Sequence, residues 1–451
     1  MENRNGNFFE FLANEQLYFP VELVEDFLLS LKAKPFVILC GGSGTGKTKL
    51  AQAYGRFISA SEEGTKIANF NVTLNKSDKN RGFTLSRDEF FDNLPFDGRR
   101  GNGLYRVRLG NVESEGEIDL TPRFWFRESD DLADEITRLK SEGQEKAILQ
   151  MMIPQEKISG NNYRIVPVGS NWTESRFITG YRNVLTGKYA TTDSLDLVIR
   201  ANRNPDEPFL LILDEMNLSH VERYFSDMLS AMESGERICL DTGDDEEVPR
   251  EIYASDNLFI VGTVNMDETT YSFSPKVLDR SNVIEFDPIP VSSYLSGPGS
   301  SGKPSGDVDF LQNCMNGHRI RCNKAPDILQ KIRESGVNDA IADAMVEDLG
   351  NLQRCMESMG LPIGLRTLDE FMRFMYAAWI YTGRGEFSSY RRFFDSQIRQ
   401  KILPKVHGGQ EIMEGLKNMK ATCAERGYMR SADRIDRMIS ALEKQRYVSF
   451  N

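Results

Sequence analysis

The chain is poor in the residues from which metal sites, disulfide frameworks and nucleophilic centres are built. It has three histidines and six cysteines among 451 residues. Six scattered cysteines are too few for a disulfide framework in a chain of this size. No histidine pairs with a serine or cysteine in a pattern typical of nucleophilic catalysis. Cys314, His318 and Cys322 are evenly spaced, but a closed zinc site needs four ligands and no fourth lies nearby, so chance spacing is favoured.

Long apolar runs and an excess of positive charge are also missing. No segment approaches the roughly 20 apolar residues that span a bilayer, and the first residues do not resemble a secretory signal. We therefore expect a cytoplasmic protein with no membrane partner. With 55 basic and 67 acidic residues the net charge is −12, which disfavours non-specific coating of nucleic acid. Residues 76–108 are relatively basic, so a local basic groove that binds nucleic acid stays an alternative. A charged face exposed to solvent is the favoured interpretation of this stretch.

A glycine-rich loop stands out against this background. Residues 41–48 read GGSGTGKT and fit the pattern G-x-x-x-x-G-K-[ST] at every fixed position. An apolar segment typical of a buried strand precedes the loop, and apolar residues recur at helical spacing after it. In such a loop, backbone N–H groups and the helix N-terminus bind phosphate oxygens. The pattern predicts a nucleoside triphosphate site formed by Gly41, Gly42, Ser43, Gly44, Thr45, Gly46, Lys47 and Thr48, with Lys47 on the β- and γ-phosphates and Thr48 on Mg²⁺.

A second predicted strand ends in two adjacent carboxylates. Residues 209–217 read FLLILDEMN, in which five apolar residues precede Asp214 and Glu215. Ligands bind at the carboxyl ends of the strands in open parallel sheets. Asp214 is therefore placed to bind the nucleotide's Mg²⁺ together with Thr48, and Glu215 to deprotonate an attacking water.

A third predicted strand, over residues 257–264, is followed by Asn265, whose amide could bond the attacking water or the γ-phosphate. A short predicted helix then ends in Arg280, before a strand at residues 282–286. Arg280 could stabilise transition-state charge in a neighbouring subunit. An equally good interpretation is a surface arginine paired with Asp279.

The order of the segments GGSGTGKT, LILDEMN, VGTVNMDE, VLDRSNVIEF and LPIGLRTLDEF resembles the AAA+ superfamily. Within it, residues 16–385 are similar to the McrB branch, the motor subunits of modification-dependent restriction systems, close to the dynein-related group. The resemblance implies an α/β core with a parallel sheet, a small helical lid and a helical C-terminal extension. It also implies a hexamer-like ring, a McrC-like nuclease subunit as partner and access to DNA through that assembly. For this chain, the resemblance implies that Asp214 and Glu215 are the Walker B residues and that Asn265 is sensor 1. It implies that Arg280 is the trans-acting arginine finger and that Arg366 is sensor 2.

The chain departs from the McrB pattern after sensor 1. The McrB signature MNxxDR has no counterpart here, because Glu268 and Thr269 occupy the places of its aspartate and arginine. This absence puts the GTP preference of McrB in doubt. ATP is therefore favoured as substrate and GTP stays open.

The remaining segments predict a multidomain organisation. We expect an N-terminal helical segment at 1–34, a nucleotide-binding core at 35–290 with a β-rich insertion near 75–160, and a flexible linker at 291–307. A helical lid at 308–385 and a helical extension at 386–451 complete the chain. Trp172, Arg176 and Tyr181 are candidate substrate or partner contacts, although an aromatic packing segment is favoured.

The leading hypothesis is a ring-forming ATPase or GTPase that drives a partner nuclease or DNA translocation. An alternative is a protein-remodelling ATPase of the MoxR or dynein-related kind with no nucleic-acid role. A nucleotide-gated scaffold without turnover is disfavoured, because every hydrolytic residue is present.

Overall fold

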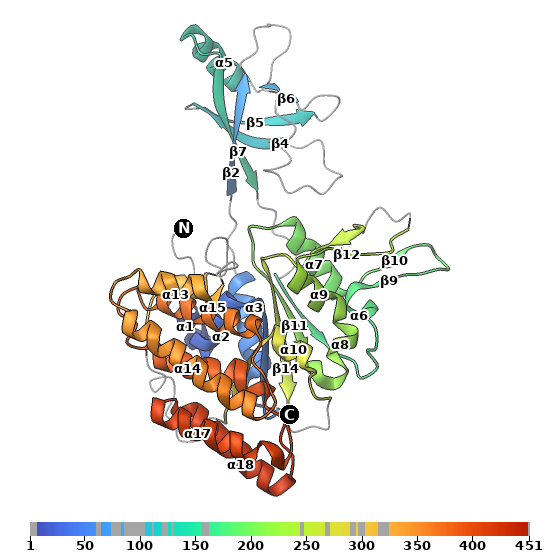
Figure 1. Cartoon of the computed structure of the whole chain (residues 1–451). Helices are drawn as coiled ribbons and strands as arrows, with labels where there is room; N and C mark the ends of the chain where they lie inside the picture. The colour runs from blue at the N-terminus through green and yellow to red at the C-terminus, as the bar shows by residue number, and fades with distance from the viewer. Residues whose placement is uncertain are drawn as a thin grey trace. The chain divides into compact units, whose positions relative to one another are not determined.

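The structure is a computed structural model that describes residues 7–59, 65–73, 83–84, 104–110, 112–119, 125–127, 130–154, 162–243, 248–266, 271–288, 295, 303–313 and 324–449. The chain divides into two compact units (Figure 1). Unit 1 comprises Met1–Ala60 and Asn162–Asn451, and unit 2 comprises Ser61–Asn161. Among the described residues, no helix combines the length and apolarity needed to cross a membrane.

Unit 1 is built on a five-stranded parallel sheet in the order β15-β1-β14-β11-β8. Its strands are β1 (Phe36–Gly41), β8 (Tyr163–Pro167), β11 (Phe209–Asp214), β14 (Leu258–Asn265) and β15 (Asn282–Phe286). The three central strands are buried along nearly their whole length, as expected for a sheet covered on both faces. The predicted α/β fold with a parallel sheet flanked by helices is confirmed.

Helices cover both faces of this sheet. On one face, α1 (Phe8–Asn14), α2 (Val21–Ala33) and α3 (Lys47–Ser59) share a core cluster with alternate residues of the central strands, among them Val37 and Leu39. The intervening residues face the other side, where Phe36 contacts Phe225 between α8 (Val221–Tyr224) and α9 (Ser226–Ser234). Helix α7 (Asp193–Arg203) lies on that second face, because Arg200 stacks over Phe209.

Unit 1 also contains several short helices and strands. They are α6 (Arg176–Thr179), β9 (Tyr181–Arg182), β10 (Tyr189–Ala190), η1 (Met216–Leu218), β12 (Ile238–Cys239), β13 (Glu251–Ile252) and α10 (Pro275–Arg280). Strands β9 and β10 form one antiparallel ribbon and β12 and β13 another.

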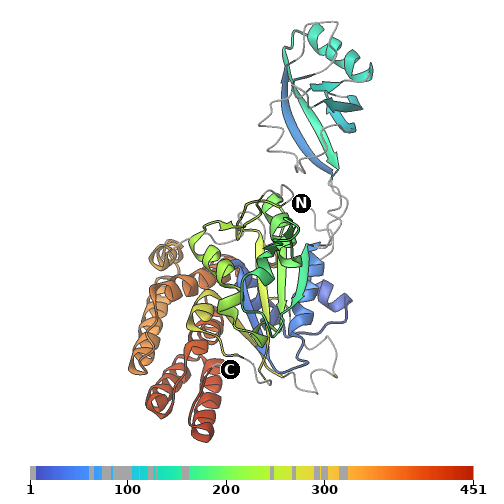
Figure 2. The same cartoon turned by 90° about the vertical axis from the view of Figure 1, so that its right-hand side faces the viewer.

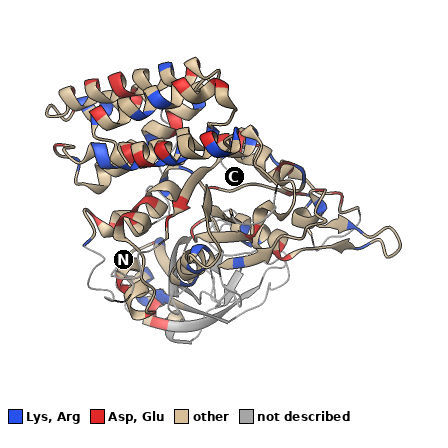
Figure 3. Ribbon diagram, turned by 90° about the horizontal axis from the view of Figure 1, so that it is seen from below, with Lys and Arg blue, Asp and Glu red and all other residues tan. Residues whose placement is uncertain are grey.

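The C-terminal part of unit 1 is helical, as predicted (Figure 2). It contains α12 (Val308–Gln312), α13 (Ala325–Arg333), α14 (Asp339–Ser358), α15 (Leu365–Tyr381), α16 (Tyr390–Gln397), α17 (Met413–Arg426) and α18 (Met429–Gln445), with short turns η3 (Ile398–Ile402), η4 (Leu403–Lys405) and η5 (Gln410–Ile412). The helical spacing of Leu365, Leu368, Phe371, Met372 and Met375 predicts one shared apolar face. This prediction is wrong for Leu365, because its side chain is 81% exposed at the first residue of α15. In the view of Figure 3, Lys and Arg are interspersed with Asp and Glu along the helices.

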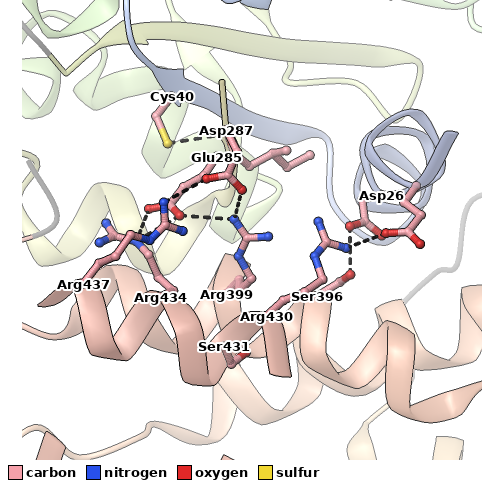
Figure 4. Close-up of polar contacts among 12 residues, drawn as sticks. Asp26, Cys40, Glu285, Asp287, Ser396, Arg399, Arg430, Ser431, Arg434 and Arg437 are labelled. Atoms are coloured by element: carbon pink, nitrogen blue, oxygen red, sulfur yellow. Dashed lines mark hydrogen bonds and ion pairs between the residues drawn. The ribbon is translucent and has the colours of Figure 1, made fainter. Parts of the chain in front are cut away.

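Ion pairs attach these helices to the edge of the sheet (Figure 4). Arg399 of η3, which is 9% exposed, contacts Asp287 at 2.9 Å and Glu285 at 3.4 Å, just beyond and on β15. Arg434 of α18 contacts Glu285 at 2.7 Å. Burial would raise the pKa of Asp287, but Arg399 and Arg437 outweigh it and hold the pKa below its usual value. The outer edge of β15 is therefore covered by charged side chains of the C-terminal helices.

A second buried network joins α2, α10, α15 and η3. Glu370 on α15 contacts Lys34 and, at 2.5 Å, Lys401. Lys34 and Lys401 also donate to the carbonyl of Asp279 at 3.0 and 2.9 Å. Burial would raise the pKa of Glu370, but the two ammonium groups lower it to about 2. Glu370 is thus the counter-ion that allows two lysines to be buried under α10.

Unit 2 contains a six-stranded antiparallel sheet in the order β2-β7-β4-β5-β6-β3. Its strands are β2 (Thr65–Thr73), β3 (Phe83–Thr84), β4 (Leu104–Leu109), β5 (Val112–Asp119), β6 (Trp125–Arg127) and β7 (Lys146–Pro154), with helix α5 (Asp130–Ser141). The pattern of residues 128–148, acidic and then helical, predicts a helix that ends at 148, but residues 146–148 belong to β7.

Replacing Glu370 by Gln should lower the free energy of unfolding by about 3–5 kcal/mol at neutral pH, because Lys34 and Lys401 would stay buried without their counter-ion. Chemical denaturation measures this loss. Glu347→Gln is a matched control, since Glu347 is 61% exposed in its ion pair with Arg426 and should cost less than about 1 kcal/mol.

The stability difference between the wild type and Glu370→Gln should shrink with acid. Glu370 has its pKa lowered from 4.5 to about 2 in the folded state. Its stabilisation is therefore complete above pH 4.5 and is lost as the pH falls towards 2. A difference that stays constant between these pH values would contradict the proposed role of the buried network.

Candidate functional site

The glycine loop joins the end of β1 to the start of α3. Gly41, the last residue of β1, has φ +150°, and a Cβ there would lie 2.8 Å from the carbonyl oxygen of Phe286. Gly44 and Gly46 have φ +78° and +93°. These angles lie in a region that side-chain-bearing residues rarely adopt. The glycines are therefore needed for the chain to turn from the strand into the helix, as the sequence pattern predicts.

Lys47, the first residue of α3, is 5% exposed and its side chain folds back over the loop. Its ammonium group donates to the carbonyls of Gly41 at 3.0 Å and Gly42 at 2.6 Å. The hydroxyl of Thr45 also accepts from this group at 3.4 Å, and donates to the Gly42 carbonyl at 2.9 Å. The positive charge thus lies within the turn of the loop, where phosphate oxygens bind in loops of this pattern.

Asp214 lies beside this loop although it is 166 residues further along the chain. One of its carboxylate oxygens, Oδ1, accepts from the Thr48 hydroxyl at 2.8 Å and from the Thr263 hydroxyl at 2.7 Å. The parallel register explains the meeting, because β14 pairs with both β1 and β11 and the three strands end at the same edge. The predicted partners Thr48 and Asp214 are therefore in direct contact.

Glu215 follows Asp214 in a left-handed backbone conformation with φ +54°. Its N–H donates to the Thr263 hydroxyl at 3.0 Å, and its carboxylate accepts from the Asn265 amide at 3.2 Å. Positive φ is uncommon for a residue with a side chain and occurs preferentially at functional sites. Asn217, which is buried in η1, donates to the Asn265 carbonyl at 3.4 Å. The structure thus brings together Lys47, Thr48, Asp214, Glu215 and Asn265.

The donor set suits Mg²⁺ bound jointly with phosphate. Thr48 and Asp214 offer a hydroxyl and a carboxylate oxygen 2.8 Å apart, and Mg²⁺ is usually held by one or two carboxylates together with water and substrate phosphates. In the described part of the chain, no group of three or more His, Cys, Asp or Glu side chains could hold a metal by itself. The spaced Cys314, His318 and Cys322 lie outside the described residues.

Arg280 and Arg366 are brought together at a different place. Arg280, the last residue of α10, forms an ion pair with Glu233 Oε2, and Arg366 of α15 forms one with Glu233 Oε1. Arg280 is not paired with Asp279, whose carboxylate contacts Lys405 instead. In the parallel sheet Asn282 is level with Val37 and Phe286 with Gly41. Arg280 therefore lies near the amino end of β15, and the glycine loop lies at the carboxyl edge.

Phe19 packs against the loop from the N-terminal segment. A Cβ on Gly46 would lie 2.9 Å from the ring of Phe19, and this ring contacts Phe286 edge-on with centroids 6.3 Å apart. The resemblance to the AAA+ superfamily implies that Tyr18, Phe19 or Pro20 lines the pocket of the nucleotide base, and core packing is an equally good interpretation of these residues. The structure places it beside the last glycine of the loop.

The aromatic segment after β8 lines a cavity of about 500 Å³. Trp172, Arg176 and Tyr181 all contribute to its wall, together with Ser194 of α7. Trp172 stacks on Phe177 with centroids 5.3 Å apart, and its carbonyl accepts from the Ser219 hydroxyl at 2.5 Å. The segment is therefore attached to the turn that follows Glu215. Packing, the interpretation favoured from sequence, accounts for the Trp172 ring.

Sequence reasoning missed two residues of these clusters. Thr263 is the single side chain that bonds both Asp214 and the backbone of Glu215. It could have been found, because it is the one polar side chain within the otherwise apolar residues 258–264. Glu233 had no such signal, since it is one of several acidic residues near the end of α9.

Part of the chain matches a known protein family. Residues 319–447 match a family described as a domain of unknown function (DUF8727). No curated protein matches the chain. Among solved structures, the chain is similar to a "putative ATPase" from Cytophaga hutchinsonii, with 10% identity, a TM-score of 0.39 and coverage of 88% of this chain and 87% of that chain.

Replacing Gly46 by Ala should destabilise unit 1 by about 1–3 kcal/mol, because the residue needs a positive φ that alanine adopts at a cost and because the new Cβ would press against Phe19. Equilibrium unfolding in denaturant measures the change. Gly350→Ala is the control, since Gly350 lies within α14 with open space around it and alanine there should stabilise the helix by about 1 kcal/mol. Equal stabilities of the two variants would show that the loop does not require this conformation.

Proposed function

We propose that the chain is a nucleoside triphosphatase whose catalytic site is completed by a second copy of itself. The observation that carries the proposal is the meeting of Thr48, Asp214 and Glu215 beside Lys47 at one edge of the sheet. Each of these residues was expected at a triphosphate site from its motif. Lys47 and Thr48 begin α3, whereas Asp214 and Glu215 lie at the end of β11. The resemblance to the AAA+ superfamily supports the same function.

The residues of the site have two kinds of role in hydrolysis: some bind the nucleotide, and one accepts a proton. The Lys47 ammonium exchanges its bonds to loop carbonyls for bonds to the β- and γ-phosphate oxygens, and the loop N–H groups bind the remaining charge. Thr48 and Asp214 would hold Mg²⁺, which would neutralise negative charge on the phosphates. Glu215 accepts a proton from the attacking water as the water oxygen bonds to the γ-phosphorus. The bond from the γ-phosphorus to the β–γ bridging oxygen breaks at the same time, and the nucleoside diphosphate leaves. The Asn265 amide, at 3.2 Å from the Glu215 carboxylate, fixes the direction of that base.

Arg280 and Arg366 supply positive charge to the site of the adjacent subunit. Within one subunit, four residues of β1, roughly 13 Å of strand, separate the level of Asn282 from that of Gly41. Arg280 precedes Asn282, and Arg366 pairs with the same carboxylate as Arg280, that of Glu233. Neither arginine is therefore placed to reach the glycine loop of its own subunit. In a closed ring with head-to-tail interfaces, the same edge of one subunit can face the catalytic edge of the next. Hydrolysis then depends on assembly.

We further propose ATP as the favoured substrate, with GTP as the alternative, since Glu268 and Thr269 stand in place of the McrB signature residues. These two positions lie outside the described residues. By its resemblance the ring belongs to a McrB-like restriction system with a nuclease partner. The interspersed charges of Figure 3 and the net charge of −12 fit a motor that reaches DNA through its assembly.

Mixing two inactive variants tests whether the site is shared. Glu215→Gln should bind nucleotide but hydrolyse it at least about 10²-fold more slowly, because it lacks the base. Arg280→Ala should assemble but hydrolyse about 10³-fold more slowly, because it lacks the charge opposite the γ-phosphate. In an equal mixture, about one quarter of the interfaces combine an intact Glu215 with an intact Arg280. Phosphate release should therefore recover to about a quarter of the wild-type rate.

The control mixture combines Arg280→Ala with the double variant Glu215→Gln/Arg280→Ala. No interface in that mixture has both intact residues, so it should stay inactive. If the first mixture is as inactive as the control, Arg280 does not act in the neighbouring site.

A second measurement separates the restriction motor from the protein-remodelling alternative. Phosphate release by the wild type should increase when DNA and a McrC-like nuclease subunit are added together, since a restriction motor is coupled to both. The assay is run with ATP and with GTP to determine which nucleotide is the preferred substrate. Stimulation by a protein client in the absence of DNA would instead favour the MoxR-like or dynein-related function.

A further inference from the structure

One carboxylate holds both of the arginines assigned to the neighbouring site. Glu233 lies near the end of α9, and each of its two oxygens contacts the Nη2 atom of a different arginine, Arg280 of α10 and Arg366 of α15. A guanidinium that serves a neighbouring triphosphate must direct these terminal nitrogens outward. In the isolated subunit they are directed towards their own α9 helix.

A second link keeps the two arginines side by side. Lys405 of η4 contacts the Asp279 carboxylate and, at 2.6 Å, the Thr367 hydroxyl. Asp279 immediately precedes Arg280, and Thr367 immediately follows Arg366. Lys401 adds bonds to the carbonyls of Asp279 at 2.9 Å and Ser281 at 2.7 Å, on both sides of Arg280. The backbones of α10 and α15 are thus held together independently of Glu233.

The cluster has unequal charge and reaches the surface. Two guanidinium groups face one carboxylate, which leaves one net positive charge among Glu233, Arg280 and Arg366. Their side chains are 32%, 22% and 46% exposed, so solvent screens and weakens both ion pairs. A triphosphate carries more negative charge than one carboxylate. It can therefore displace Glu233 from both arginines when a neighbouring subunit presents it.

The same surface carries an apolar residue that a partner would cover. Leu365, next to Arg366 at the start of α15, is 81% exposed. Large apolar side chains beside a charged cluster are typical of surfaces that are buried on association. A second copy of the chain is the partner that brings a triphosphate to this place.

We propose that Glu233 is an intramolecular competitor of the neighbouring nucleotide. It holds Arg280 and Arg366 on the subunit's own surface and releases both together when a second copy docks with its triphosphate bound. The proposal rests on the proposed shared site and adds a device that suppresses interface formation until nucleotide is present. Because Lys405 keeps α10 and α15 together, the two arginines stay side by side after they dissociate from Glu233.

The test is the dependence of phosphate release on protein concentration for Glu233→Gln, which removes the charge and keeps the shape. Without its competitor, the arginine pair should engage the neighbour more readily. The protein concentration for half-maximal turnover per subunit should fall about three- to ten-fold, as expected for losing two partly exposed ion pairs. Maximal turnover at high concentration should stay at the wild-type value.

Glu236→Gln is the matched control, because it removes the same charge three residues away, where no contact with either arginine is found in the described part of the chain. It should leave the concentration dependence unchanged. Sedimentation of Glu233→Gln with a non-hydrolysable triphosphate analogue measures assembly directly, and assembly should also occur at lower concentration. In the Arg280→Ala/Arg366→Ala background, Glu233→Gln should have no effect on either measurement.

Two outcomes would overturn the inference. An unchanged half-maximal concentration would show that Glu233 does not compete with the neighbour. A lower maximal turnover would show that Glu233 aligns the arginines for catalysis. Failure of the shared site would be recognised separately, because the mixture of Glu215→Gln and Arg280→Ala would then recover no activity.

Discussion

The site depends on the parallel pairing of β14 with both β1 and β11. This register places Gly41, Asp214 and Asn265 at one edge of the sheet, although more than 200 residues separate the first from the last. Parallel strands need long crossover connections, and these connections are the helices that cover the two faces. Four side-chain bonds of the candidate site follow from this alignment: Thr48 to Asp214, Thr263 to Asp214, Thr263 to the backbone of Glu215, and Asn265 to Glu215.

The opposite side of the architecture carries the arginines. Helix α10 ends where β15 begins, so Arg280 lies far along the strand direction from the glycine loop of its own subunit. The lid helix α15 is tied to α10 through Glu370, Lys34, Lys401 and Lys405, and this places Arg366 beside Arg280. Buried ion pairs of this kind are costly to desolvate but geometrically specific. They define how the C-terminal helices sit on the core and hence where both arginines lie.

The C-terminal helices are therefore part of the site's construction. The region that matches the domain of unknown function includes η3 and α18, whose arginines contact Glu285 and Asp287 beside β15. Strand β15 is an edge of the sheet, and its neighbour β1 ends in the glycine loop. A family match over these helices thus coincides with the segment that covers the sheet edge, carries Arg366 and supplies Lys401 and Lys405, which contact Asp279 of α10. This arrangement gives the region a structural role that its description leaves open.

The sequence by itself determined the α/β core, the phosphate loop, the paired carboxylates at Asp214 and Glu215 and the helical C-terminal region. Local signals carry these features: glycines where φ is positive, apolar runs for buried strands and helical spacing of apolar side chains. Only the tertiary structure decided that Thr263 bonds the Asp214 carboxylate, that Leu365 is exposed and that Glu233 holds both arginines. These contacts link residues from different elements, and no spacing pattern encodes them. Their positions follow from the strand register and from buried ion pairs, which form only when the whole of unit 1 is folded.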